Sequence, residues 1–272
     1  MKENTAMKLT VLGSGNAQAT KIYNTCLLFD DGKERLLVDA GGGNQILSLL
    51  EKKNIPLTSI SHLFMTHAHI DHILGCIWII RRIAEEMNKN KYDGIFTVHA
   101  HPELIDFVTS FCRETLTKKI TALFGERIIF VPNRDRESVP MMGGLLTPFD
   151  IHSTKLKQFG FVLERENLKI VDAGDEPLDE GNADLAEGAD WLTHEAFCLY
   201  GDRDIYHPYE KSHSTVKDAA ELGERLRVKN LLLYHTEDKS GVETRKERYT
   251  EEAEKYYSGN IFVPDDGDEI IL

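Results

Sequence analysis

The chain has 272 residues and a mass of 30.9 kDa, enough for one large domain or two small ones. Its 41% hydrophobic and 28% charged residues exclude a mostly disordered protein, and its net charge of −13 excludes a broad nucleic-acid-binding surface. No segment approaches the roughly 18 apolar residues of a membrane helix. The first residues lack a secretory signal, so we expect a cytoplasmic protein without membrane contact. The four dispersed cysteines predict buried thiols rather than disulfides.

Apolar patterns predict about a dozen strands and at least five helices in a single domain spanning residues 1–272. In the first half we expect strands at 8–12, 25–30, 35–38, 60–65 and 97–100, and helices at 44–53, 73–87 and 102–117. In the second half we expect strands at 127–131, 144–150, 160–164, 168–171, 191–193, 230–234, 261–263 and 269–272. Two further helices are predicted at 215–226 and 244–257. This mixture of strands and helices indicates an α/β (α+β) protein.

The strongest chemical signal is the run Thr66-His67-Ala68-His69-Ile70-Asp71-His72, between a predicted strand and a predicted helix. Imidazole nitrogens and carboxylate oxygens are good ligands for zinc, manganese or iron. In an extended turn His67 and His69 point the same way and can hold one ion. Asp71 and His72 can then face a second ion. The alternative is a polar loop that merely contains histidines, which the rarity of histidine disfavours.

His-x-His-x-Asp-His at a strand end resembles the signature of the metallo-β-lactamase superfamily, and later segments match its other motifs in order. Residues 189–196 and 212–215 resemble segments of the ribonuclease Z-like phosphodiesterase branch. The resemblance implies a four-layer αββα sandwich of two mixed β-sheets with helices outside. It also implies two divalent metal ions, zinc or else manganese or iron, and a homodimer.

The resemblance also implies a set of metal ligands. One ion would be bound by His67, His69 and His152. The other would be bound by Asp71, His72 and His235, with Asp175 bridging the two ions. Asp172 competes for the bridging role, although the neighbouring glycine and proline favour Asp175. Asp39, in the first motif, would orient a metal-bound histidine.

The implied catalytic residues are Asp71, His213 and Glu195. His213 would stabilise the phosphoryl charge or protonate the leaving oxygen, supported by Glu195 or His194. For His194, a buried and hydrogen-bonded structural role is the alternative.

Other polar residues carry weaker signals. Three lysines flank His152 and His213 and could clamp a phosphate, although surface lysines are usually only solvated: Lys155, Lys157 and Lys211. For the pair His99 and His101, packing or helix capping is favoured over metal binding.

These residues predict a metal-dependent hydrolase, and the resemblance implies a phosphodiesterase in which activated water attacks phosphorus. Enzymes of this branch that process tRNA carry a long basic arm between the third and fourth motifs, which correspond here to His152 and Asp175. The residues between them, 153–174, are too few for such an arm. A small or cyclic phosphodiester is therefore favoured over RNA. A basic segment with Arg81, Arg82, Lys118 and Lys119 could instead cover a substrate. The alternatives are a ribonuclease Z-type tRNA 3′ endonuclease, a thioester or lactone hydrolase, and a degenerate metal-binding module.

Overall fold

The computed structural model describes residues 6–272, which divide into two compact units. The first unit contains Thr25–Arg134 together with the chain up to Leu12 and the last segment, Gly267–Leu272. The second unit contains Gly13–Asn24 and Asp135–Asp266. Each unit has one seven-stranded sheet and its own helices.

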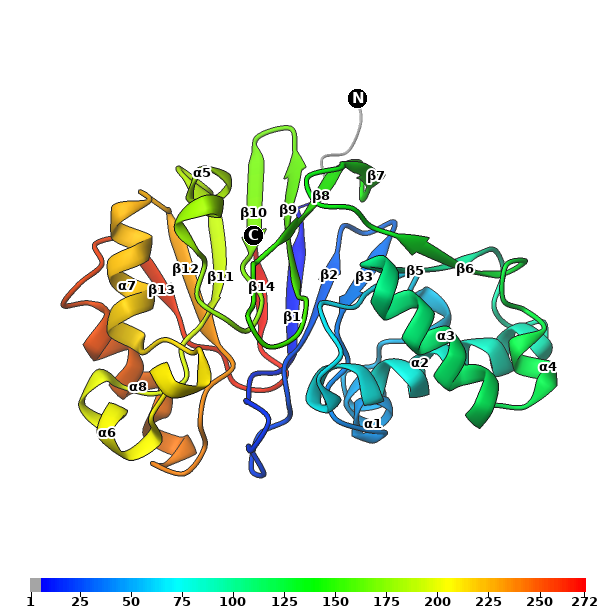
Figure 1. Cartoon of the computed structure of the whole chain (residues 1–272), viewed down its shortest axis with the longest axis horizontal. Coiled ribbons are helices and arrows are strands. Elements are labelled where there is room, and N and C mark those ends of the chain that lie inside the picture. The colour runs from blue at the N-terminus through cyan, green and yellow to red at the C-terminus, as the bar shows by residue number, and fades with distance from the viewer. Residues whose placement is uncertain (1–5) are drawn as a thin grey trace. The chain divides into compact units, whose positions relative to one another are not determined.

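The sheet of the first unit has the strand order β14-β1-β2-β3-β4-β5-β6 (Figure 1). The strands are β1 Lys8–Gly13, β2 Cys26–Asp30, β3 Arg35–Val38, β4 His62–Phe64, β5 Phe96–Ala100, β6 Ile128–Pro132 and β14 Glu269–Ile271. The sheet is mixed, because β2 and β3 form an antiparallel hairpin whereas β3, β4, β5 and β6 run parallel. The helices are α1 Gln45–Lys52, α2 Ile70–Asn88, α3 Pro102–Thr115 and α4 Lys118–Thr121. Helix α3 packs on β5 and β6.

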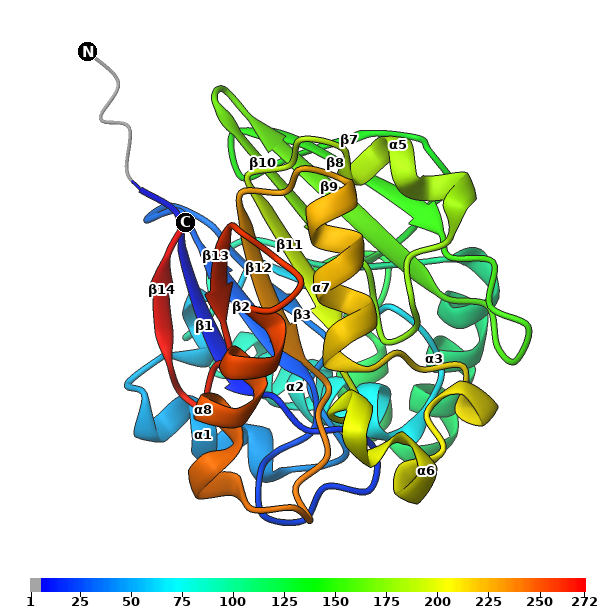
Figure 2. The same cartoon turned by 90° about the vertical axis from the view of Figure 1, so that its left-hand side faces the viewer.

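The sheet of the second unit has the order β13-β12-β11-β10-β9-β8-β7. Its strands are β7 Val139–Met141, β8 Gly144–Asp150, β9 Phe159–Arg165, β10 Leu168–Asp172, β11 Trp191–Glu195, β12 Asn230–Tyr234 and β13 Asn260–Phe262. Strands β10 to β13 are parallel, and β7 to β10 form an antiparallel meander. The helices are α5 Ala183–Ala186, α6 Arg203–Tyr206, α7 Val216–Arg225 and α8 Val242–Ala253. Figure 2 looks onto α7, which packs on β11 and β12.

The elements agree with the expected order and differ at their ends. Helix α2 begins at Ile70, three residues earlier than predicted, so that Asp71 and His72 lie in its first turn. Strand β7 and helix α4 were not predicted, because segments of three and four residues are too short for a periodic pattern. All four cysteines are buried thiols, as expected. Among residues 6–272, no helix has both the length and the apolarity needed to cross a bilayer.

Helix α7 shows how local sequence defines an element of the second unit. Val216, Ala219, Ala220 and Gly223 are buried at helical spacing against the core that contains Leu192 and Leu231. Thr215 caps the helix in a capping box: its hydroxyl accepts from the Asp218 amide at 3.4 Å, and the Asp218 carboxylate accepts from the Thr215 amide at 2.9 Å.

We expect Thr215→Ala to lower the free energy of unfolding by about 1 kcal/mol, because the first turn of α7 loses its cap. Thermal or chemical unfolding of the purified variant measures this loss. Thr109→Ala in α3 is the control, since that hydroxyl donates to carbonyls of its own helix and does not cap it. An equal loss in both variants would contradict the capping role.

Candidate metal centre

The histidine run occupies the connection between β4 and α2 in the first unit. His67 and His69 lie in the extended segment before the helix, and His69 is the N-cap residue of α2. The Nε2 atom of His67 lies 2.8 Å from the Nδ1 atom of His69, so the two imidazoles converge as the sequence predicts. Asp71 lies in the first helical turn, where a carboxylate is stabilised by the helix dipole.

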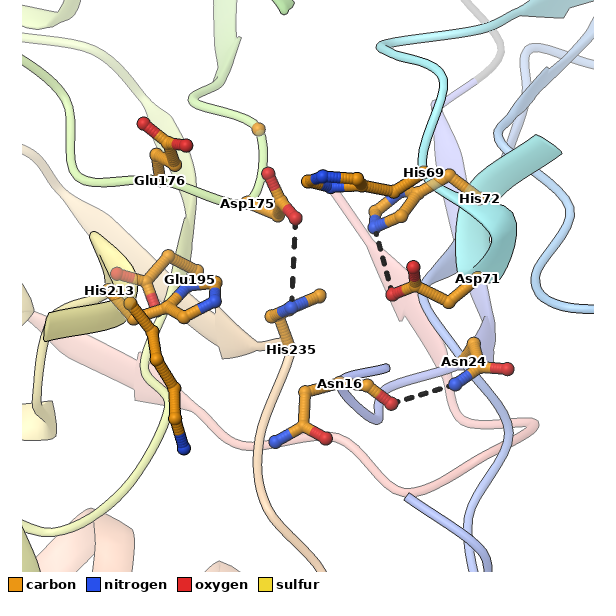
Figure 3. A network of polar contacts seen from close by, with 12 residues as sticks. Asn16, Asn24, His69, Asp71, His72, Asp175, Glu176, Glu195, His213 and His235 are labelled. Atoms are coloured by element: carbon orange, nitrogen blue, oxygen red, sulfur yellow. Dashed lines mark hydrogen bonds and ion pairs between the residues drawn. The ribbon is translucent and has the colours of Figure 1, made fainter. Parts of the chain in front are cut away.

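Asp39 organises this segment from the end of β3. Its carboxylate accepts hydrogen bonds from the Thr66 amide at 2.9 Å and the Thr66 hydroxyl at 2.6 Å. It also lies 2.6 Å from Nδ1 of His72, and the Thr66 hydroxyl lies 2.9 Å from Nδ1 of His67. Both rings are therefore held at Nδ1, with Nε2 on the opposite side. The Nε2 atom of His72 lies 3.4 Å from the carboxylate of Asp71 (Figure 3).

The donor set of the first unit fits a divalent metal ion. Asp39, His67 and His72 are buried with their side-chain donor atoms within 4.8 Å of one another, so that two histidines offer ligands and Asp39 orients one of them. Histidines that bind metals usually have their second ring nitrogen held by a carboxylate or another hydrogen-bonding group, as His72 does by Asp39. The cluster can therefore bind a divalent metal, and imidazole with carboxylate suits zinc, manganese or iron.

We expect Asp39→Asn to weaken zinc binding by about 10–100-fold, because an amide has one acceptor oxygen and cannot accept from the Thr66 amide at Oδ1 and from His72 at Oδ2 as the carboxylate does. Titration of the metal-free protein with zinc measures this change. Asp31→Asn is the matched control, since Asp31 is also buried in this unit but accepts from backbone amides of the hairpin. Wild-type zinc affinity in Asp39→Asn would contradict the orienting role of Asp39.

In the second unit, Asp175 and His235 lie beside each other (Figure 3). The Oδ2 atom of Asp175 is 3.8 Å from the Nε2 atom of His235, and both residues are buried. Two ligands of one tetrahedral zinc ion, each about 2.1 Å from it, lie roughly 3.4 Å apart. The carboxylate of Asp172, the competing candidate, instead accepts hydrogen bonds from the hydroxyls of Thr193 and Tyr234. The second unit thus places Asp175 rather than Asp172 against His235.

His213 and Glu195 form a second group in this unit, in which Glu195 is buried and the side chain of His213 is 12% exposed (Figure 3). The Nδ1 atom of His213 lies 3.6 Å from the Glu195 carboxylate, whose other oxygen accepts from the Ser214 amide. The His213 ring stacks on Phe197, with 4.9 Å between the centroids, and its centroid lies 5.2 Å from that of His235. Burial lowers the pKa of His213, but the neighbouring carboxylate of Glu195 outweighs burial, so the pKa lies above its ordinary value.

His194 is turned toward the backbone. Its Nδ1 lies 2.7 Å from the carbonyl of Glu195, and its Nε2 accepts from the Leu178 amide at 3.2 Å. Both ring nitrogens are thus engaged by main-chain groups, which favours the structural role. Glu195 is the member of this pair that faces His213.

His152 stands apart from the other predicted ligands of the second unit. Its side chain is 60% exposed, and its Nδ1 lies 2.6 Å from the carboxylate of Asp179, which raises the pKa of His152. This contact resembles that between His72 and Asp39. In the part of the chain that the structure describes, His152 is in no cluster of three ligand groups.

Three predicted site residues have left-handed backbone, which costs a residue other than glycine about 1–3 kcal/mol and is common at functional sites. They are Asp39, His152 and His235, with φ of 52°, 58° and 55°. Asp39 and His235 directly follow β3 and β12. The surrounding structure therefore holds these residues in strained positions.

The remaining histidines and lysines singled out in the sequence make contacts within the protein. His101 caps α3 by accepting from the Leu104 amide, as predicted. His99 lies 3.3 Å from His62, and burial lowers its pKa to about 4. Lys155 donates to the carbonyl of Lys211, whose own ammonium donates to the carbonyl of Tyr206 at 2.7 Å.

Sequence reasoning missed three residues that support the site: Thr66, Asp179 and Tyr234. Thr66 directly precedes His67, the first histidine of the run, and a hydroxyl there is a detectable signal. Asp179 and Tyr234 have no such signal, because each contacts residues distant in the sequence.

Comparison with known proteins gives the family. The sequence profile described as "Anti-Pycsar protein Apyc1" matches residues 7–256. The chain is 23% identical over 309 residues to a ribonuclease Z of Archaeoglobus fulgidus, with 95% of each chain covered. It is 27% identical over 265 residues to a ribonuclease Z of Ignicoccus hospitalis, with 84% of this chain and 87% of the relative covered.

Solved structures show the same fold. The metallo-β-lactamase fold protein YhfI from Bacillus subtilis has a TM-score of 0.78 at 18% identity, with 97% of this chain and 99% of that one covered. The short form of human tRNase Z has a TM-score of 0.74 at 20% identity, with the same coverage. A diphosphatase from the PhnP family has a TM-score of 0.73 at 16% identity, with 97% of this chain and 96% of that one covered.

These similarities confirm the predicted αββα fold class and the ribonuclease Z-like branch of the metallo-β-lactamase superfamily. With its cluster of histidine and aspartate side chains that could hold a metal ion, the chain is a hydrolase of that superfamily and belongs to the family described as Anti-Pycsar protein Apyc1.

Proposed function

We propose that this protein is a metal-dependent phosphodiesterase acting on a small or cyclic phosphodiester. The observation that carries the proposal is the buried histidine cluster of the first unit, in which Asp39 and Thr66 hold His72 and His67 at Nδ1. Relatives named ribonuclease Z and a structural neighbour named a PhnP-family diphosphatase support chemistry at phosphorus.

The order of the motifs along the chain carries the ligand assignment, which remains a proposal. In this proposal His67, His69 and His152 would hold one ion, and Asp71, His72 and His235 would hold the other, with Asp175 as a further ligand. When bound, two divalent ions supply positive charge that activates water and stabilises the phosphoryl oxygens. We propose zinc, since imidazole and carboxylate suit it.

In this proposal the catalytic group besides the metal ligands is His213. Phe197 stacks on its ring and the Glu195 carboxylate faces its Nδ1, so the orientation of the imidazole is defined before substrate binds. His213 then donates a proton to the leaving oxygen or stabilises the charge on the phosphoryl group. Glu195 acts as the positioning residue by keeping Nδ1 protonated.

Two observations favour a small substrate. Residues between His152 and Asp175 form the strands β9 and β10 rather than a long basic arm. Arg81 and Arg82, which could cover a larger substrate, are paired with Glu85. Cleavage of precursor tRNA is the second candidate, favoured by the relatives named ribonuclease Z. The homodimer implied by the resemblance stays a prediction.

Hydrolysis of bis(p-nitrophenyl) phosphate by the zinc-loaded protein tests the proposal, with His67→Ala as the matched blank. We expect turnover in the wild type alone, because His67 is a proposed metal ligand. A panel of cyclic nucleotides and a precursor tRNA then separates the two candidates. Absence of turnover on every phosphodiester, with zinc bound, would overturn the phosphodiesterase assignment.

A further inference from the structure

The hydroxyl of Tyr234 lies beneath the turn that carries Asp175. Tyr234 is the last residue of β12, it is 1% exposed, and it directly precedes His235. Its hydroxyl donates to the carbonyl of Gly174 at 2.8 Å. One buried side chain thus connects the strand that ends before His235 to the residue that precedes Asp175.

The same hydroxyl has a second acceptor, the Oδ1 atom of Asp172 at 3.2 Å. That oxygen also accepts from the hydroxyl of Thr193, which is paired with Asp172 in the register of β10 and β11. The network therefore joins three neighbouring parallel strands, β10, β11 and β12. Because all of its members are buried, each hydrogen bond is strong and costly to leave unmade.

The turn after β10 needs such a contact. Gly174 has φ of +80°, so the backbone reverses there in a conformation that only glycine adopts easily. His235 is also left-handed. The 3.8 Å separation between the Asp175 carboxylate and the His235 imidazole therefore depends on two positions with left-handed backbone, Gly174 and His235.

We propose that Tyr234 is a positioning residue that sets the geometry of Asp175 toward His235 through its hydrogen bond to Gly174. This inference rests on the proposed function, in which Asp175 and His235 bind metal. Asp172 has a supporting part: it accepts from the hydroxyls of both Thr193 and Tyr234, so it helps to hold the tyrosine ring in place beneath Gly174.

Tyr234→Phe tests the proposal, with Tyr257→Phe as the matched control. Tyr257 is another buried tyrosine of this unit, and its hydroxyl donates to the carbonyl of Val228 at 2.8 Å. Both variants lose one buried hydroxyl, so we expect similar losses of thermal stability in the metal-free proteins. Titration with zinc should show a loss of affinity of about 10–100-fold in Tyr234→Phe alone.

Cobalt substitution provides a second measurement, because the visible spectrum of bound cobalt responds to ligand geometry. We expect a changed spectrum in Tyr234→Phe and a wild-type spectrum in Tyr257→Phe. If Tyr234→Phe does not fold, Thr193→Val replaces it, and we expect a smaller loss of zinc affinity in the same direction.

Equal zinc affinities and spectra in the two tyrosine variants would overturn the positioning role. Asp175→Ala separates this failure from that of the proposed function. If Asp175→Ala binds zinc like the wild type, the ligand assignment itself is wrong. If Asp175→Ala loses zinc while Tyr234→Phe retains it, only the role of Tyr234 is wrong.

Discussion

Replacing His213 with alanine should lower kcat on a phosphodiester by about 10²–10⁴-fold, the range for loss of a general acid. The imidazole stacks on Phe197 beside Glu195 and is not among the proposed metal ligands. The zinc content should therefore stay at the wild-type value. Steady-state kinetics and metal analysis of the same preparation measure both quantities.

Glu195→Gln is the companion variant for His213→Ala. An amide at this position still contacts His213 but carries no charge to favour the protonated ring, so we expect a smaller loss of kcat. A kcat of His213→Ala within a factor of three of the wild type would remove His213 from the mechanism. Loss of zinc in that variant would instead make His213 a metal-site residue.

Gly75→Ala should destabilise the protein by about 3 kcal/mol, at the upper end of the usual cost of overpacking. A Cβ atom on Gly75 would lie 1.7 Å from the carbonyl oxygen and 2.5 Å from the carbonyl carbon of Ala40. Because the clash is with backbone, α2 must move away from the loop after β3. Asp39, next to Ala40, would then lose its contact with His72 in the first turns of α2.

Thermal unfolding measures this change, and a midpoint lower by roughly 6–12 °C is expected for a chain of this size. Gly43→Ala is the matched control, since a Cβ there meets no atom within 4 Å. Zinc affinity should fall in Gly75→Ala and stay unchanged in Gly43→Ala. Equal midpoints for the two variants would show that the approach of α2 to Ala40 is not a close one.

Much of the first unit could be predicted from the sequence, because its signals are local. The Asp31-Gly32 pair predicts the hairpin of β2 and β3, and the structure has this hairpin with φ of 83° at Gly32. His67 and His69 are two residues apart in an extended segment, so their convergence at 2.8 Å follows from the alternation of side chains.

In the second unit, local sequence patterns do not predict which side chains contact each other. His194 and Glu195 are neighbours in β11, and successive side chains of a strand point to opposite faces. Only one of them can face His213, and the sequence does not reveal which. The packing of α7 and its preceding loop decides it, since Ser214 and His213 contact Glu195.

The sequence by itself determined the candidate ligand residue types, the order of the motifs and the superfamily, because these depend on residue types and short spacings. Only the tertiary structure decided that Asp175 rather than Asp172 lies against His235. That choice depends on the pairing of β10, β11 and β12, which brings the hydroxyls of Thr193 and Tyr234 to Asp172. Strand register decides which residues far apart in the chain form hydrogen bonds, and a short sequence pattern does not predict strand register.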